Sequence, residues 1–152
     1  AGLALPQLTK GRLQTKQVGE ITILDDTYNA NPDSVAAGLA TLMQIPGNGR
    51  RVAVLGVMGE LGTEAEAGHR RVGKAAADSG IACLIAIGGN ARWIAEAARN
   101  GGLAEVIHVA DIDEAVAALR GFAREGDIVL VKGSRSARLE RVVEALEEGA
   151  TV

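Results

Sequence analysis

Polar side chains gather in the stretch Asp25–Asn31, directly after an apolar run with β-branched residues. The stretch holds two aspartates, one tyrosine and two asparagines. Carboxylates at the end of a strand can bind ribose hydroxyls or the water shell of a magnesium ion. Turn chemistry explains one such aspartate, and less easily explains two aspartates beside two asparagines. The stretch is therefore a candidate ligand site.

Two further loops carry groups suited to a ligand. Lys132 and Arg135 follow the last apolar run and precede a helical pattern, so both cations could pair with phosphate or carboxylate beside a helix N-terminus. A solvated helix start is the alternative. The segment Gly56–Gly62 either lets a ligand approach the backbone or is a plain tight turn, because it lacks the GxGxxG spacing of a dinucleotide site.

Alternating strand and helix patterns must position these loops, in units of roughly 25 to 30 residues that are typical of βαβ structure. Strands are predicted at Ile21–Leu24, Arg51–Leu55, Ile81–Ile87, Val106–Val109 and Ile128–Val131. Buried parallel strands joined by amphipathic helices predict an α/β fold: a Rossmann-like, doubly wound, mostly parallel sheet with helices on both faces. The carboxyl ends of the strands share one edge, where we expect the three loops to meet.

The sequence also indicates where the domain and two of its helices begin. Residues 1–19 are predicted to be a linker and an edge strand near Leu13–Val18 at the start of the domain, and residues 20–152 to form the Rossmann-like domain itself. Asn31 followed by Pro32 predicts a helix start. Thr63, with Glu66 three positions later, predicts a capping box for a helix over Glu64–Ser79.

The composition restricts the class of protein. A length of 152 residues with 47% apolar residues suits one globular domain. The net charge of -3 is spread along the chain, and one Trp, one Tyr and one Phe give no stacking platform, so no nucleic-acid partner is expected. The single cysteine, Cys83, favours a reducing compartment. Without a bilayer-length apolar run or a secretory leader, we expect a cytoplasmic protein with no membrane partner.

Two other signals do not predict a site. Gly68–Ala75 matches a Walker A loop up to its lysine, but it lies inside a predicted helix and ends in alanine where magnesium requires a hydroxyl. His69 and His108 lack metal-ligand spacing. We therefore expect structural roles for both histidines and no metal site.

Four segments, in order along nearly the whole chain, carry a family resemblance. Asp25–Ser34, with the sequence DDTYNANPDS, resembles the DD-[ST]-YNANP-DS signature of Mur ligases that add D-alanyl-D-alanine to the cell-wall precursor. Val54–Gly62 resembles the VLGDMGELG segment of that family, residues 69–73 resemble its HxxVG motif, and Leu130–Ser136 resembles its LVKGSRS. The chain is similar to the C-terminal domain of these three-domain enzymes.

The resemblance implies an ATP-dependent ligase of peptidoglycan synthesis. The intact enzyme would use ATP and magnesium to phosphorylate the carboxylate of UDP-N-acetylmuramoyl-tripeptide, and the amine of D-alanyl-D-alanine would then attack the acyl phosphate. ATP and Mg²⁺ would be bound mainly by the central domain, with the N-terminal domain as a further partner. The C-terminal domain would close on them and supply no catalytic residue by itself.

The resemblance also assigns residues. The nucleotide-binding set is Arg12, Asp26, Tyr28, Asn29 and Asn31, with Asp26 toward the ribose and Arg12 toward the terminal phosphate. The set on the dipeptide side is Glu60, Lys132, Ser134 and Arg135. Val57 stands where the family usually has aspartate, which implies either altered substrate handling or a tolerated change.

Two alternatives stay open from the sequence. One is a self-contained nucleotide-binding module with no ligase role, and the other is a non-catalytic interaction domain that kept the fold. An in-frame phosphate loop upstream would favour the ligase over the first alternative. Unchanged kinetics for ATP after substitution of Asp26 or Arg12 would favour the second.

Overall fold

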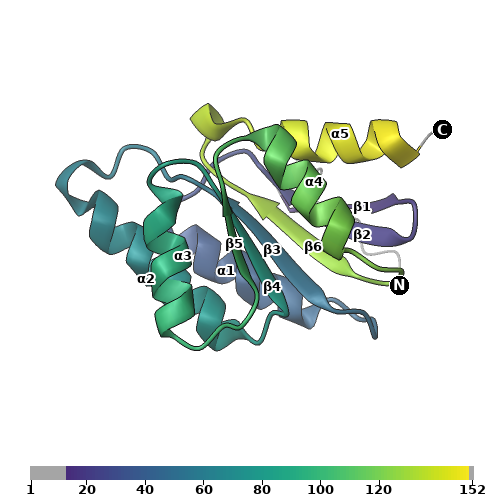
Figure 1. The fold of residues 1–152 in the computed structure, drawn as a ribbon, viewed down its shortest axis with the longest axis horizontal. Helices are drawn as coiled ribbons and strands as arrows, with labels where there is room; N and C mark the ends of the chain where they lie inside the picture. The colour runs from purple at the N-terminus through teal and green to yellow at the C-terminus, as the bar shows by residue number, and fades with distance from the viewer. Residues whose placement is uncertain (1–12, 151–152) are drawn as a thin grey trace, which may run out of the picture.

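The computed structural model describes residues 13–150, which contain one mixed sheet (Figure 1). Within these residues the sheet has six strands in the order β1-β2-β6-β3-β4-β5. Their bounds are β1 (Gln14–Val18), β2 (Ile21–Asp26), β3 (Arg51–Gly56), β4 (Cys83–Ile87), β5 (Val106–Val109) and β6 (Ile128–Lys132). β1 is antiparallel to β2 at one edge, and all other neighbours are parallel.

Helices cover both faces of the sheet (Figure 1). One face carries α1 (Pro32–Gln44), α2 (Ala65–Ser79) and α3 (Ala91–Asn100), and the other carries α4 (Ile112–Phe122) and α5 (Glu140–Ala150). The chain runs outward from β2 to β5 and then returns through α4 to place β6 between β2 and β3. Because crossovers are right-handed, reversing the direction of travel moves the helix to the other face. The predicted doubly wound, Rossmann-like α/β fold is confirmed.

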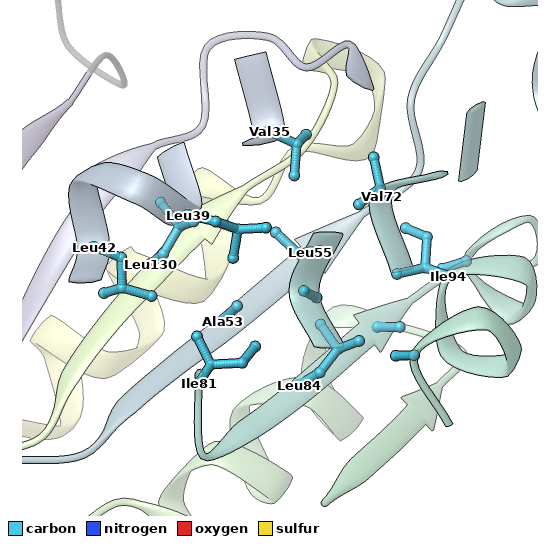
Figure 2. Close-up of a cluster of buried hydrophobic side chains, with 14 of the residues drawn as sticks. Val35, Leu39, Leu42, Ala53, Leu55, Val72, Ile81, Leu84, Ile94 and Leu130 are labelled. Carbon is cyan, nitrogen blue, oxygen red and sulfur yellow. The ribbon is translucent and has the colours of Figure 1, made fainter. Parts of the chain in front are cut away.

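The core is aliphatic on both sides of the sheet. On the side of α1 to α3, Leu39, Leu55, Leu84 and Ile94 are fully buried (Figure 2). Consecutive apolar residues along β4 and β6 are buried on both faces, which explains why these strands show no polar alternation. Full burial of one such side chain contributes roughly 1.5–3 kcal/mol, so the central strands form a rigid platform for the loops at their ends. Within residues 13–150, no helix combines the length and hydropathy needed to cross a membrane.

Local signals set the start of α1 but not that of α2. The Asn31 side chain accepts the Ser34 amide at 2.8 Å, and the Ser34 hydroxyl accepts the Asn31 amide at 3.0 Å, so the predicted cap is present. The capping box predicted at Thr63 is wrong. Helical backbone begins earlier, in the 3₁₀ turn η1 (Gly62–Glu64), so Thr63 lies inside a turn and not at the extended position that a cap requires.

A buried carboxylate fastens the amino-terminal edge of the sheet. The Asp127 carboxylate, just before β6, accepts three hydrogen bonds: from Nη2 of Arg50 at 2.8 Å, from the Arg50 amide at 3.1 Å and from the Arg124 amide at 2.9 Å. The Arg50 guanidinium also lies 4.0 Å from the ring centroid of Phe122. Burial alone would raise the pKa of Asp127, but the hydrogen bonds from Arg50 and Arg124 outweigh burial and hold the pKa below its usual value.

Asp127→Asn should lower the thermal unfolding midpoint by several degrees at neutral pH, because an amide cannot accept all these hydrogen bonds. A carboxylate with a depressed folded pKa stabilises the folded state above its unfolded pKa of about 4, and that contribution is lost as pH falls through the folded value. Thermal melts of both proteins from neutral to strongly acidic pH measure the effect. The difference between them should narrow on the acid side, and a constant difference would contradict this interpretation.

The thiol of Cys83 is fully buried at the start of β4. Burial, with a smaller effect from the Glu105 carboxylate, raises the pKa of this thiol to about 11. Because the thiolate is the reactive form, we expect no labelling of the folded chain by DTNB at mildly alkaline pH and full labelling after unfolding in guanidinium chloride. Rapid labelling of the folded chain would contradict the burial of this residue.

Candidate functional site

A cleft of about 340 Å³ opens at the carboxyl edge of the sheet, between the loop after β2 and the first turns of α1. Four predicted nucleotide-binding residues line it: Asp26, Tyr28, Asn29 and Asn31. Lys132 lines it as well. Asp26 and Lys132 are 106 positions apart in the chain, yet they are direct partners in the register of β2 and β6.

The two adjacent aspartates serve opposite faces of the sheet, because successive strand residues alternate. Asp26 faces the cleft beside α1. Asp25 is turned to the other face, where Oδ1 accepts the Thr27 hydroxyl at 2.8 Å and Oδ2 lies 3.5 Å from Nζ of Lys16 on β1. Lys16 also lies 3.8 Å from Glu147 of α5. Asp25 therefore fastens β1 through Lys16, which also reaches α5, while Asp26 is available to the cleft.

A buried ion pair forms the floor of the cleft. Nζ of Lys132 donates to Oδ2 of Asp26 at 2.6 Å and to the backbone carbonyl oxygen of Asn29 at 3.0 Å. The side chains of Lys132 and Asp26 are 3% and 10% exposed. Removing one partner of such a buried pair typically costs about 3–5 kcal/mol. Within residues 13–150, Oδ1 of Asp26 accepts no hydrogen bond, so this oxygen is left to water or to a ligand.

A glycine in α1 makes room for the pair. A Cβ atom at Gly38 would lie 3.3 Å from Cδ of Lys132 and 3.6 Å from Oδ2 of Asp26. Glycine inside a helix costs about 0.5–1 kcal/mol relative to alanine. Glycine is favoured here in spite of this cost, because α1 passes close to the Lys132 side chain.

The other predicted dipeptide-side residues do not line the cleft: Glu60 and Ser134 lie on loops, and Arg135 begins the 3₁₀ turn η2 (Arg135–Ala137). The Ser134 amide donates to the Val57 carbonyl oxygen at 3.1 Å, which joins the loop after β6 to the loop after β3. The Arg135 guanidinium lies over the Tyr28 ring, 5.1 Å from its centroid. Glu60 is exposed, with a left-handed backbone (φ +62°). Val57 packs against the apolar core, which accommodates a valine at this position.

His69 fixes the glycine-rich loop. Its Nε2 accepts the Met58 amide at 3.0 Å, and its Nδ1 lies 2.6 Å from the Ala65 carbonyl oxygen. Because an amide can only donate and a carbonyl can only accept, these two contacts select the tautomer of His69 with its proton on Nδ1. Nε2 of His108 lies 2.7 Å from the Gly88 carbonyl oxygen. Both histidines therefore make contacts that fit the structural roles expected from the sequence.

The other sequence signals can also be placed. Residues 68–75, with the spacing of a Walker A loop, lie inside α2, so their rejection as a phosphate loop is confirmed. Among the described residues, no group of three or more His, Cys, Asp or Glu side chains could hold a metal ion. Arg12 lies outside the described residues.

Part of the cleft wall was missed from the sequence: Leu13, Ser34, Ala37, Gly38 and Thr41. The last four share one face of α1 at the i, i+3, i+4, i+7 spacing of a helix, so a stripe of small residues directly after the Asp25–Asn31 stretch was the available signal. Leu13 is 45% exposed with φ +46°, and the sequence carries no signal for it.

Fold and cleft together define a Rossmann-like α/β domain. Its candidate site lies beside β6, where the direction of the crossovers reverses. Sheets of this kind bind ligands at such a point. Comparison with protein families is more specific. Residues 11–135 match the family described as Mur ligase, glutamate ligase domain, and the chain belongs to that family.

Individual relatives agree with the family match. The UDP-N-acetylmuramoyl-tripeptide–D-alanyl-D-alanine ligase of Escherichia coli K12 is 42% identical, with 99% of this chain and 32% of the relative aligned. The enzyme of the same name from Mycobacterium tuberculosis H37Rv is 40% identical, with 94% and 32% aligned. This chain spans about a third of the length of these curated relatives.

Solved structures give the same result. The crystal structure of MurF ligase from Thermotoga maritima in complex with ADP matches with a TM-score of 0.82 at 28% identity, covering 98% of this chain and 33% of that one. A MurF structure from Acinetobacter baumannii matches with a TM-score of 0.84 at 31% identity, covering 97% and 32%.

His69→Phe should lower the free energy of unfolding by about 1–3 kcal/mol, because the buried Met58 amide loses its acceptor. The phenyl ring keeps an aromatic group beside Trp93, whose ring centroid lies 6.0 Å from that of His69. Denaturant titration followed by fluorescence of Trp93, the single tryptophan, measures the change. Glu66→Gln is the control, since it removes an exposed ion pair on the same helix and should change little. Equal effects of the two substitutions would contradict the role given to His69.

Proposed function

We propose that this chain is the C-terminal domain of an ATP-dependent ligase that adds D-alanyl-D-alanine to UDP-N-acetylmuramoyl-tripeptide in the synthesis of the peptidoglycan precursor. The curated relatives that carry this name are 32–42% identical and include matches over nearly all of the chain. In this proposal, residues 20–152 form the domain that closes on the rest of the enzyme, and residues 1–19 supply a linker and the edge strand β1 at its start.

One observation carries the proposal: the residues of the Asp25–Asn31 stretch that resemble the family signature converge on a single cleft. Asp26, Tyr28, Asn29 and Asn31 all line it, although nothing in an isolated turn requires four polar neighbours to face the same space. A carboxylate, a phenol and two amides supply donors and acceptors suited to a ribose and a base, and the related Thermotoga maritima structure is described as a complex with ADP.

The proposed roles follow from the positions of these groups. Asp26 accepts hydrogen bonds from the ribose, and Tyr28, Asn29 and Asn31 surround the nucleotide. Arg12 contacts the terminal phosphate. Glu60, Ser134 and Arg135 form the side of the site that receives D-alanyl-D-alanine, whereas Lys132, which the resemblance also assigns there, lines the cleft beside Asp26. Arg135 is exposed and stacked on Tyr28, so its guanidinium is placed to pair with a carboxylate beside the nucleotide.

In the proposed reaction, the γ-phosphoryl group of ATP is transferred to the tripeptide carboxylate, and the dipeptide amine then displaces phosphate to form the amide. ATP and Mg²⁺ are held mainly by the central domain of the intact enzyme, in the cytoplasm. This domain binds and orients the reactants, and its closure excludes water from the reactive acyl phosphate.

The purified 152-residue chain should show no magnesium-dependent ATP hydrolysis. The same chain joined to the N-terminal and central domains of the Escherichia coli relative should release ADP only when UDP-N-acetylmuramoyl-tripeptide and D-alanyl-D-alanine are both present. The two Escherichia coli domains without this chain are the control. ATP turnover by the chain alone, or equal ligase activity with and without it, would contradict the proposal.

Substitutions in the fused enzyme test the assigned nucleotide contacts. Asp26→Ala and Arg12→Ala should each raise KM for ATP by about tenfold or more, as expected for loss of a charge-assisted contact. Unchanged KM values for ATP would leave the non-catalytic interaction domain as the better description.

A further inference from the structure

We propose that Lys132 is a positioning residue of the nucleotide cleft, which acts by holding Asp26 and the loop at Asn29 in place and does not contact the dipeptide. This inference rests on the proposed function and changes the role that the family resemblance gives to Lys132. Its basis is the pair of hydrogen bonds from Nζ, at 2.6 Å to Oδ2 of Asp26 and at 3.0 Å to the carbonyl oxygen of Asn29.

Lys132 is poorly placed to bind the carboxylate of an incoming dipeptide. Its side chain is 3% exposed, and its positive charge is already neutralised by Asp26. Two of its three N–H donors are engaged. A dipeptide carboxylate would have to displace the Asp26 carboxylate from a buried pair. Arg135, by contrast, is exposed and has no carboxylate partner within residues 13–150.

The backbone of Lys132 belongs to a strand that has a paired neighbour on each side. It ends β6, where it is the register partner of Asp26 on β2 and of Leu55 on β3. Its side chain runs beneath α1, where Gly38 leaves only the space that the chain of methylene groups fills. A rigid anchor of this kind transmits the geometry of the sheet to the groups bonded to it.

The two acceptors of Lys132 are the points that a nucleotide site needs to keep fixed. The hydrogen bond from Lys132 to Oδ2 of Asp26 fixes the orientation of the carboxylate, while Oδ1 is left without a hydrogen bond from the described residues. Clamping the Asn29 carbonyl fixes the turn in which the Asn29 side chain accepts the Ala30 amide at 2.9 Å. Lys132 therefore presents both Asp26 and the asparagine loop to the cleft.

Kinetics of the fused ligase separate this role from direct contact with the dipeptide. Lys132→Met should raise KM for ATP by about tenfold and leave KM for D-alanyl-D-alanine within about twofold. Lys132→Gln, which keeps an N–H donor, should give an intermediate KM for ATP. Asp26→Asn combined with Lys132→Met should raise KM for ATP by clearly less than the product of the two single effects, because the two substitutions share the contact between Lys132 and Asp26. A rise confined to KM for D-alanyl-D-alanine, or additive effects of the two substitutions, would overturn the inference.

A second measurement needs no ligand and uses the 152-residue chain. Hydrogen exchange followed by NMR should show the amides of Ala30 and Asn31 exchanging at least about tenfold faster in Lys132→Met, because the turn loses its anchor. Asp127→Asn is the matched control, because it alters a buried carboxylate at the opposite sheet edge. After correction for any change in global stability, the exchange rates of these two amides should be the same as in the unsubstituted chain. Unaltered exchange in Lys132→Met would overturn the inference even if the ligase proposal fails, whereas inactivity of the unsubstituted fusion would count against the ligase proposal alone.

Discussion

The position of β6 between β2 and β3 is the constraint on which the candidate site depends. The chain reaches this position last, after α4 has carried it back across the sheet. β6 is buried on both faces, so its register against its two neighbours is fixed by packing as well as by backbone hydrogen bonds. That register sets Lys132 beside Asp26, and it brings the loop after β6 next to the loops after β2 and β3. A one-residue slip of β6 would turn Lys132 toward α5 and leave Asp26 without its cation.

The loops around the site are attached to this framework by a small number of specific bonds. Lys132 holds the Asn29 carbonyl, the Ser134 amide holds the Val57 carbonyl, and His69 holds the Met58 amide. Each bond connects a loop to a strand end, a helix or a second loop, so the loops share the rigidity of the sheet. The polar site therefore has a buried, well-packed base, which is the arrangement that makes ion pairs and hydrogen bonds strong.

Charge is balanced inside the described part of the cleft. Asp26 and Lys132 neutralise each other, and Asp127 and Arg50 do the same at the opposite edge of the sheet. The cleft thus presents hydrogen-bonding groups more than net charge, which suits a ribose and a base better than a polyphosphate. In the proposed enzyme, the phosphate charges would be met by Arg12 and by groups of the central domain.

The sequence by itself determined the class of fold, the strand positions within a few residues and the cap of α1, and it grouped Asp26, Tyr28, Asn29 and Asn31, which line one cleft. These features are local, because hydrophobic periodicity, a capping motif and a contiguous signature can be recognised in the sequence without knowledge of the tertiary contacts. Tertiary structure alone decided that Asp26 faces the cleft while Asp25 fastens β1, that Lys132 is committed to Asp26, and that Gly38 makes room for both. It also replaced the cap expected at Thr63 with a 3₁₀ turn. These outcomes depend on strand order and register, which join residues 106 positions apart and leave no periodic trace in the sequence.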